Sequence, residues 1–136
     1  MEGVNSIIKE VKFREIKTEI RILGIDDCAF KPHSHGSVDV VGVVYRGGYW
    51  LDGLMTTEVQ IDGIDATEKI TRMIVNSPHY DQLRVIMLNG ITFAGFNVVD
   101  IRKLFNKTGL PVIALTKEKP DLGEIKVALK KLPQWR

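Results

Sequence analysis

The amino-acid sequence predicts an α/β protein built on one mixed five-stranded sheet, and two observations carry this prediction. In the first half, three strand-like segments are joined by turn-rich stretches, one of which is the tight "RGG" turn. In the second half, segments with helical periodicity alternate with short apolar runs, as in crossover connections between parallel strands. The predicted order is therefore βββαβαβα, with helices on the faces of the sheet.

Three strands are expected in the first half, at residues 19–26, 38–45 and 49–62. The first of them, "EIRILGID", has an apolar run without alternation, which is typical of a strand covered on both faces. The second and third flank the "RGG" turn, whose glycines accept positive φ, so the three strands most simply form an antiparallel meander. Residues 1–14 are expected to be a loose extension of a single domain spanning residues 1–136.

The second half is expected to contain three helices and two strands. They fall, in order, at residues 65–77 (helix), 82–90 (strand), 97–109 (helix), 111–115 (strand) and 121–132 (helix). Asp65, followed three residues later by Glu68, has the spacing of a capping box at the start of the first helix. Asn97 is the expected N-cap of the second helix, and Gly109 is its expected C-terminal stop.

The composition is that of an ordinary globular domain. The chain has 136 residues, of which 44% are hydrophobic and 26% charged, and its single cysteine excludes an internal disulfide bond. It contains neither an apolar run of transmembrane length nor a signal-peptide pattern, so a cytoplasmic location without membrane contact is expected. The net charge of +2 hides an asymmetry, because residues 1–101 carry −4 and residues 102–136 carry +6. This pattern suits a polyanion such as DNA together with a cation site, although a solvated lysine-rich helix also produces it.

Two adjacent carboxylates, Asp26 and Asp27, end the first strand, and Asn89 ends the fourth. In a sheet of this kind the functional site lies beyond the carboxyl ends of the parallel strands, so the tips converge if the two strands are neighbours. Oxygen ligands at a strand tip are what Mg²⁺ or Mn²⁺ requires, whereas the structural alternative is an Asp pair that caps the following loop. Asp26 is favoured as the ligand because neighbouring side chains of a strand point in opposite directions.

The order of strands and helices is that of the ribonuclease-H-like fold, and several stretches resemble one family. "EIRILGIDD", "GVVYRGGYWLDG", "IDGIDATEKI", "MLNGITFAGFNVVDI" and "TGLPVI", spread over roughly residues 15–116, are similar to the archaeal endonuclease dU family, a distant relative of endonuclease V. The resemblance implies cutting of deoxyuridine-containing DNA with the help of a divalent metal.

The resemblance also implies site residues. Endonuclease V-like enzymes carry a metal-binding Asp in a Gly-x-Asp pattern, which "GID" ending at Asp26 matches, and Glu68 is the best match for a Glu in the helix after the meander. The capping box alone also explains Glu68. Where such enzymes have Asp-Gly, this chain has "NG" at Asn89, so Mg²⁺ would bind more weakly unless Asp27 compensates. A further ligand should come from a C-terminal helix, which is expected to be truncated here.

The expected contacts with DNA come from the hairpin tip and from the loop after the fourth strand: Arg46, Tyr49, Trp50, Thr92, Phe93 and Asn97. The tip combines a cation with aromatic rings, as base-stacking elements do. Aromatic residues that serve only to pack a sheet are, however, more common than base-stacking ones. The loop is glycine-containing and opens a helix, which suits phosphate binding but fits an ordinary tight turn equally well. Phe93 is expected to stack on an exposed base.

These residues and the resemblance predict a metal-dependent endonuclease that hydrolyses a phosphodiester of deoxyuridine-containing or otherwise damaged DNA with metal-activated water. The predicted catalytic residues are Asp26, Asp27, Glu68 and Asn89, and the predicted Mg²⁺ or Mn²⁺ ligands are the three carboxylates among them. Two alternatives stay open: a nucleic-acid-binding module that has lost catalysis, and a small-molecule phosphohydrolase using the same strand tips. A truncated last helix would leave an apolar edge bare and favour a homodimer.

Overall fold

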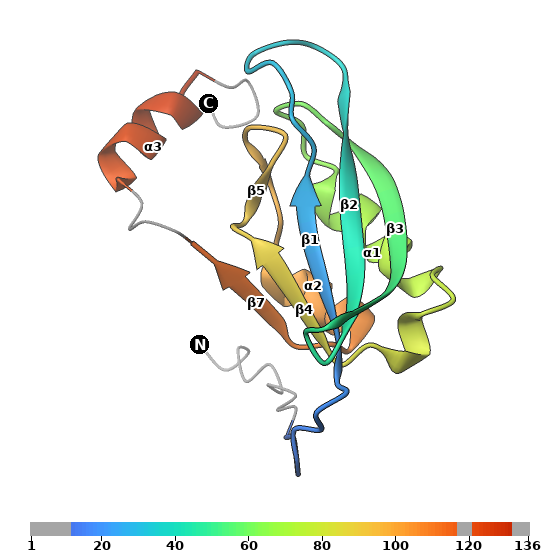
Figure 1. Ribbon diagram of the computed structural model, residues 1–136. Coiled ribbons are helices and arrows are strands. Elements are labelled where there is room, and N and C mark those ends of the chain that lie inside the picture. The colour runs from blue at the N-terminus through green and yellow to red at the C-terminus, as the bar shows by residue number, and fades with distance from the viewer. Residues whose placement is uncertain (1–11, 117–120, 132–136) are drawn as a thin grey trace.

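The computed structural model describes residues 12–116 and 121–131 (Figure 1). Its elements are, in order, β1 (Arg21–Asp27), β2 (Ser37–Arg46), β3 (Trp50–Gln60), α1 (Ala66–Val75), the short 3-10 helix η1 (Tyr80–Gln82), β4 (Val85–Asn89), β5 (Thr92–Phe93), β6 (Asn97–Val98), α2 (Ile101–Thr108), β7 (Val112–Leu115) and α3 (Leu122–Leu129). The expectations for residues 1–11 and for the last helix at residue 132 lie outside the described residues.

Five strands form one mixed sheet in the order β3-β2-β1-β4-β7, which confirms the predicted sheet. β1 pairs antiparallel with β2 and parallel with β4, so it lies at the centre of the sheet. The predicted meander of β1, β2 and β3 is also confirmed, and Gly47 and Gly48 make its tight turn with φ of 65° and 78°. The assignment to the ribonuclease-H-like fold stays a prediction.

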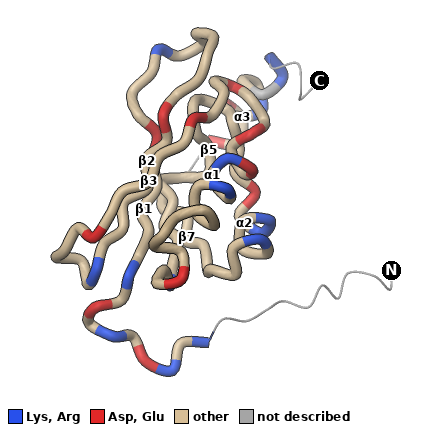
Figure 2. The backbone as a smooth tube through the Cα atoms, turned by 90° about the vertical axis from the view of Figure 1, so that its right-hand side faces the viewer, with Lys and Arg blue, Asp and Glu red and all other residues tan. Residues whose placement is uncertain are grey.

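Helices lie on one side of the sheet, whereas the sequence predicted helices on its faces in general. Figure 1 shows α1 and α2 behind the strands, and Figure 2, turned by 90°, shows both of them on the same side of β1, β2 and β3, whereas α3 lies beyond the β7 edge in Figure 1. The core fills the space between this side of the sheet and the helices, and Leu23 and Ile25 of β1 are buried in it together with Ile70 and Ile74 of α1. The opposite side has no described helix over it.

The capping box expected at the start of α1 and the N-cap residue expected for α2 are both wrong. Asp65 stands at the N-cap of α1 but makes no side-chain capping bond, and Glu68 instead pairs with Arg72 one turn later at 2.7 Å. The side chain of Asp100, rather than that of Asn97, caps α2 by accepting a hydrogen bond from the N–H of Lys103. The expected stop of α2 is confirmed, because Gly109 follows it in the left-handed conformation at φ 72°.

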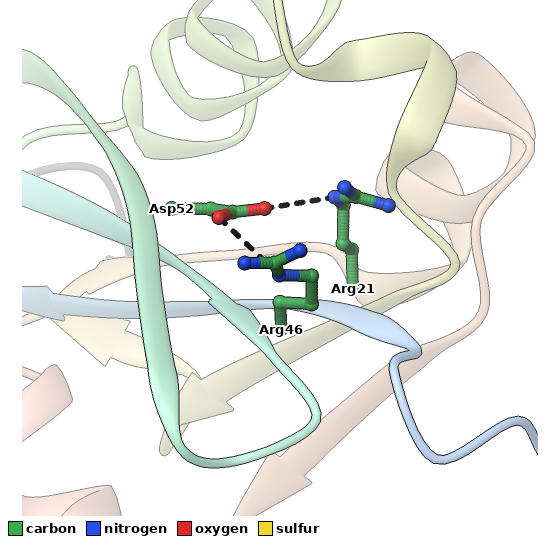
Figure 3. Close-up of polar contacts among 3 residues, drawn as sticks. All are labelled: Arg21, Arg46 and Asp52. Atoms are coloured by element: carbon green, nitrogen blue, oxygen red, sulfur yellow. Dashed lines mark hydrogen bonds and ion pairs between the residues drawn. The ribbon is translucent and has the colours of Figure 1, made fainter.

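At the amino-terminal edge of the sheet, one carboxylate lies between two arginines (Figure 3). Asp52 accepts a hydrogen bond from Nε of Arg21 at 2.9 Å, and its other oxygen lies 3.5 Å from Nε of Arg46. Arg21 and Arg46 are direct cross-strand partners, so their like charges would repel each other without the carboxylate. Asp52 therefore compensates two positive charges that the register forces together.

An Asp52→Asn variant should lower the free energy of unfolding by about 1–2 kcal/mol, because two partly buried guanidinium groups lose their counter-charge. Urea unfolding of the variant and the wild type measures this difference. Asp81→Asn, at an exposed position on η1, is the matched control and should be nearly neutral. Equal stabilities of the two variants would contradict the compensating function of Asp52.

Candidate functional site at the strand tips

The tips of β1 and β4 converge, as the sequence predicted for neighbouring strands. The parallel register sets Ile25 opposite Leu88, so Asp26 and Asn89 follow side by side at the carboxyl ends. Nδ2 of Asn89 donates a hydrogen bond to Oδ2 of Asp26 at 3.0 Å, and the N–H of Asp27 donates to Oδ1 at 2.9 Å. Asp26 and Asn89 are both exposed, so this pair presents a carboxylate and an amide to solvent.

Asp27 faces the other way along the strand and anchors a loop. Its Oδ2 accepts a hydrogen bond from the backbone N–H of Ala94 at 2.7 Å. Burial raises the pKa of the Asp27 carboxyl above its ordinary value, the N–H of Ala94 acts in the opposite direction, and the neighbouring Asp26 carboxylate raises it again. This contact is the loop-binding alternative that the sequence left open, and it separates the environment of Asp27 from that of the exposed Asp26.

The raised pKa of Asp27 predicts a pH-dependent effect. The pKa of Asp27 is higher in the folded state than in the unfolded state. The contribution of the protonated Asp27 carboxyl to the stability of the fold is therefore fully present at low pH and is lost as the pH rises through the folded-state pKa. An Asp27→Asn variant keeps an oxygen for the N–H of Ala94 but cannot ionise. We expect the stability of this variant relative to the wild type to increase between about pH 3 and about pH 7.

Urea unfolding at several pH values, with EDTA present, measures the trend for Asp27→Asn. Asp81→Asn, whose carboxyl is exposed, controls for the general effect of removing a negative charge. A stability difference that does not change with pH would contradict the assignment.

The loop that Asp27 anchors is a small hairpin of β5 and β6. Ala94 and Gly95 at its tip have φ of 46° and 86°. Asp62 contacts the hairpin as well, because its Oδ1 accepts from the N–H of Phe96 at 3.0 Å and its own N–H donates to the carbonyl of Ala94 at 2.9 Å. Asp62 is not among the residues predicted from the sequence, although the "DG" dipeptide at residues 62–63 is a turn signal. Two aspartates thus fix the hairpin beside the strand tips.

Two of the three loop residues expected to contact DNA are buried, so that expectation is wrong for them. Phe93 is 0% exposed and belongs to the core, where it cannot stack on a base. Asn97 is also 0% exposed, and its amide accepts from the N–H of Ala66 at 2.9 Å while donating to the carbonyl of Gln60 at 2.8 Å and to Oδ1 of Asp65 at 2.7 Å. Thr92 is exposed and stays a candidate.

The hairpin-tip residues lie at the other end of the sheet. Arg46 pairs with Arg21 at the start of β1, whereas Asp26 pairs with Val41, so the tip and the candidate site are separated by about 16 Å along the strand. Tyr49 and Trp50 are exposed near Arg46. The structure therefore does not bring Arg46, Tyr49 and Trp50 together with Asp26.

The predicted trio of metal-binding carboxylates is not assembled in the described part of the chain. Within residues 12–116 and 121–131, no three His, Cys, Asp or Glu side chains lie together as a metal site. Glu68 points to Arg72 on its own helix. Mg²⁺ is often held through only one or two carboxylates while it keeps several waters, so exposed Asp26 beside Asn89 fits a weakly held, largely hydrated ion.

The sequence matches a family and several of its members. The family model described as endonuclease dU matches residues 18–136. A UPF0215 protein of Methanothermobacter thermautotrophicus is 58% identical over 125 residues, which are 91% of this chain and 61% of that relative. A UPF0215 protein of Methanopyrus kandleri is 54% identical over 90% of this chain and 61% of its own length. The chain thus spans about three fifths of these relatives.

Solved structures are similar in fold. A protein of unknown function from Archaeoglobus fulgidus matches with a TM-score of 0.77 and 41% identity, over 85% of this chain and 64% of that one. Endonuclease V of Bacillus subtilis matches with a TM-score of 0.56 and 11% identity, over 75% of this chain and 46% of its own. Endonuclease V of Ciona intestinalis was solved in complex with a 24mer DNA containing an inosine. It matches with a TM-score of 0.52 and 13% identity, over 85% of this chain and 56% of that one.

The helices that the structure describes are all too short or too polar to cross a lipid bilayer. On the match over residues 18–136 and the identity to its archaeal relatives, this chain belongs to the endonuclease dU family.

Proposed function

We propose that this chain forms the strand-tip part of a metal-dependent nuclease site that cuts DNA containing deoxyuridine or another damaged base. The observation that carries the proposal is the exposed pair of Asp26 and Asn89 on adjacent parallel strands. The family name and the similarity in fold to two endonuclease V proteins, one of them bound to DNA, support the same assignment.

In this proposal Asp26 provides the negative charge that holds Mg²⁺ or Mn²⁺, and Asn89 orients the Asp26 carboxylate through its Nδ2 donor. A divalent ion, when bound, supplies a more acidic water and offsets charge on the phosphate. Asp27 and Asp62 keep the β5–β6 hairpin in place, with exposed Thr92 at its base. The fixed hairpin gives the substrate strand one rigid wall.

Cations for the DNA backbone come from the two C-terminal helices. Figure 2 shows Lys and Arg gathered on α2 and around α3. The exposed ones are Arg102, Lys103 and Lys107 on α2, Lys126 on α3, and Lys130 and Lys131 directly after it. With six exposed cations, the affinity for DNA should fall as the salt concentration rises, because each phosphate that a cation neutralises releases counterions.

The test is incision of an end-labelled duplex that carries one deoxyuridine, beside the same duplex with thymidine. The reactions contain Mg²⁺, Mn²⁺ or EDTA. We expect cutting near the deoxyuridine only in the presence of a divalent metal, and at least tenfold less cutting of the thymidine duplex. Equal cutting of both duplexes, or cutting in EDTA, would contradict the proposal.

A second candidate is a DNA-binding module without catalysis. Two observations favour it: Asn89 adds no charge beside Asp26, and no three metal-binding groups gather in the part of the chain that the structure describes. The same assay separates the candidates, because a binding module retains salt-sensitive binding to the duplex but gives no incision with either metal.

A further inference from the structure

One side of the five-stranded sheet is apolar and uncovered by the described helices. It is formed by alternate residues of all five strands, which the register places on one face: Ile22, Val41, Val43, Tyr45, Leu54, Met87, Ile113 and Leu115. We call this surface the open face. Four of its side chains are well exposed, namely Tyr45 at 43%, Leu54 at 61%, Ile113 at 46% and Leu115 at 51%.

The other side of the same strands shows how such apolar residues are normally placed. Leu23 of β1, Val40 of β2 and Ile86 of β4 are each 0% exposed beneath α1 and α2. Sheets built of parallel strands are almost always covered on both faces, and β1, β4 and β7 form the parallel part of this mixed sheet. A continuous surface of eight apolar side chains, four of them well exposed and four half-buried, is therefore the mark of a missing contact rather than of an ordinary exterior.

The open face is also hollowed. A groove of about 480 Å³ runs over β1 and is lined by Val41, Val43, Met87 and Leu115, with Asp26 and Asn89 at one end. At Gly24, in its floor, an added Cβ would have no neighbouring atom within 4 Å. The strand backbone is thus accessible to a side chain inserted from outside.

We propose that the open face docks a helical polypeptide segment with one apolar side, long enough to lay two helices across the sheet. Five strands at about 4.8 Å span about 19 Å, which two helices packed 8–10 Å apart would cover. The family provides a source for such a segment. The relative from Methanothermobacter thermautotrophicus matches this chain over only 61% of its length, so more than a third of that protein lies outside the match.

Two exposed carboxylates on the open face predict where the docked segment carries positive charge. On the same face, Asp39 lies directly opposite Glu58, and both carboxylates are exposed at the carboxyl end of the sheet. Like charges in a cross-strand pair destabilise each other unless a cation lies between them. The docked segment should therefore carry Lys or Arg where it meets this end, and apolar residues above Val43 and Leu115.

The test uses the part of the Methanothermobacter relative outside the 125 matched residues, produced as a separate polypeptide and titrated into this chain by calorimetry. We expect binding, with changes in the methyl NMR signals of Ile22 and Ile113 and little change at buried Ile86. Leu115→Lys and Leu54→Lys should each weaken binding at least tenfold, because each places a charge in the apolar contact.

Both positions are exposed, so these substitutions should leave the fold intact, which circular dichroism verifies. Ile64→Lys is the matched control, because Ile64 is 77% exposed in the loop before α1, and its binding should stay within twofold of the wild type. Three results would overturn the proposal: no binding of the segment, binding unaffected by Leu115→Lys and Leu54→Lys, or a dimer of this chain whose formation those two substitutions abolish.

Discussion

Replacing Asp26 with alanine is expected to reduce metal-dependent incision of the deoxyuridine duplex at least about 100-fold, which corresponds to about 2.7 kcal/mol of lost transition-state stabilisation. Asp26 is the exposed carboxylate at the β1 tip, and the side chain of Asn89 that donates to it from β4 is a neutral amide. Without it, the proposed ion has no charged ligand at the tip. Because Asp26 is exposed, its removal should change the free energy of unfolding by less than about 1 kcal/mol.

Two further variants make this result specific. Asp81→Ala removes an exposed carboxylate from η1, on a different element, and should leave incision within twofold of the wild type. Asn89→Asp places a second negative charge beside Asp26 and should lower the metal concentration needed for half-maximal incision, provided that the added charge is screened by the ion. If Asp26→Ala retains more than half of the activity, the strand-tip site is not the catalytic one.

Replacing Asn97 with alanine is expected to lower the free energy of unfolding by about 3 kcal/mol or more. The amide of Asn97 is fully buried and connects three elements: it accepts from the N–H of Ala66 and donates to the carbonyl of Gln60 and to Asp65. Alanine would leave the buried N–H and the carbonyl without these partners, and each such loss costs about 1–3 kcal/mol.

Urea unfolding measures the effect of Asn97→Ala. Asn106→Ala, on the exposed side of α2, is the matched control and should be neutral or slightly stabilising, because alanine is the better helix former. A loss below about 1 kcal/mol for Asn97→Ala would show that water replaces the lost partners and that the network is not a main support of the fold.

The sheet and the meeting of its tips were predictable because they depend on signals spread over many residues. The apolar run ending at Asp26, the glycine turn at 47–48 and the helical periods between strands each repeat over a whole element. Once β1 and β4 are recognised as parallel neighbours, the pairing of Asp26 with Asn89 follows from the geometry of the sheet.

The predictions that were wrong concern side chains whose partners are distant in the sequence. Asp65 and Glu68 have the spacing of a capping box, yet Asp65 is engaged by Gln60 and Asn97 instead of by its own helix. β5 and β6 have two residues each, too short for any periodic pattern, so the burial of Asn97 left no signal in the sequence. The bare side of the sheet was likewise hidden, because an apolar strand pattern does not say which face is covered.

The position of β1 has a consequence for how the chain assembles. Its antiparallel partner β2 follows directly, whereas its parallel partner β4 begins only at Val85, so residues 28–84 separate β1 from β4. Until β4 is added, the first three strands form a hairpin sheet in which the future central strand is an edge with unpaired backbone groups. During synthesis this apolar edge is the segment most prone to pair with another chain, and joining β4 to it is the long-range step that should limit the folding rate.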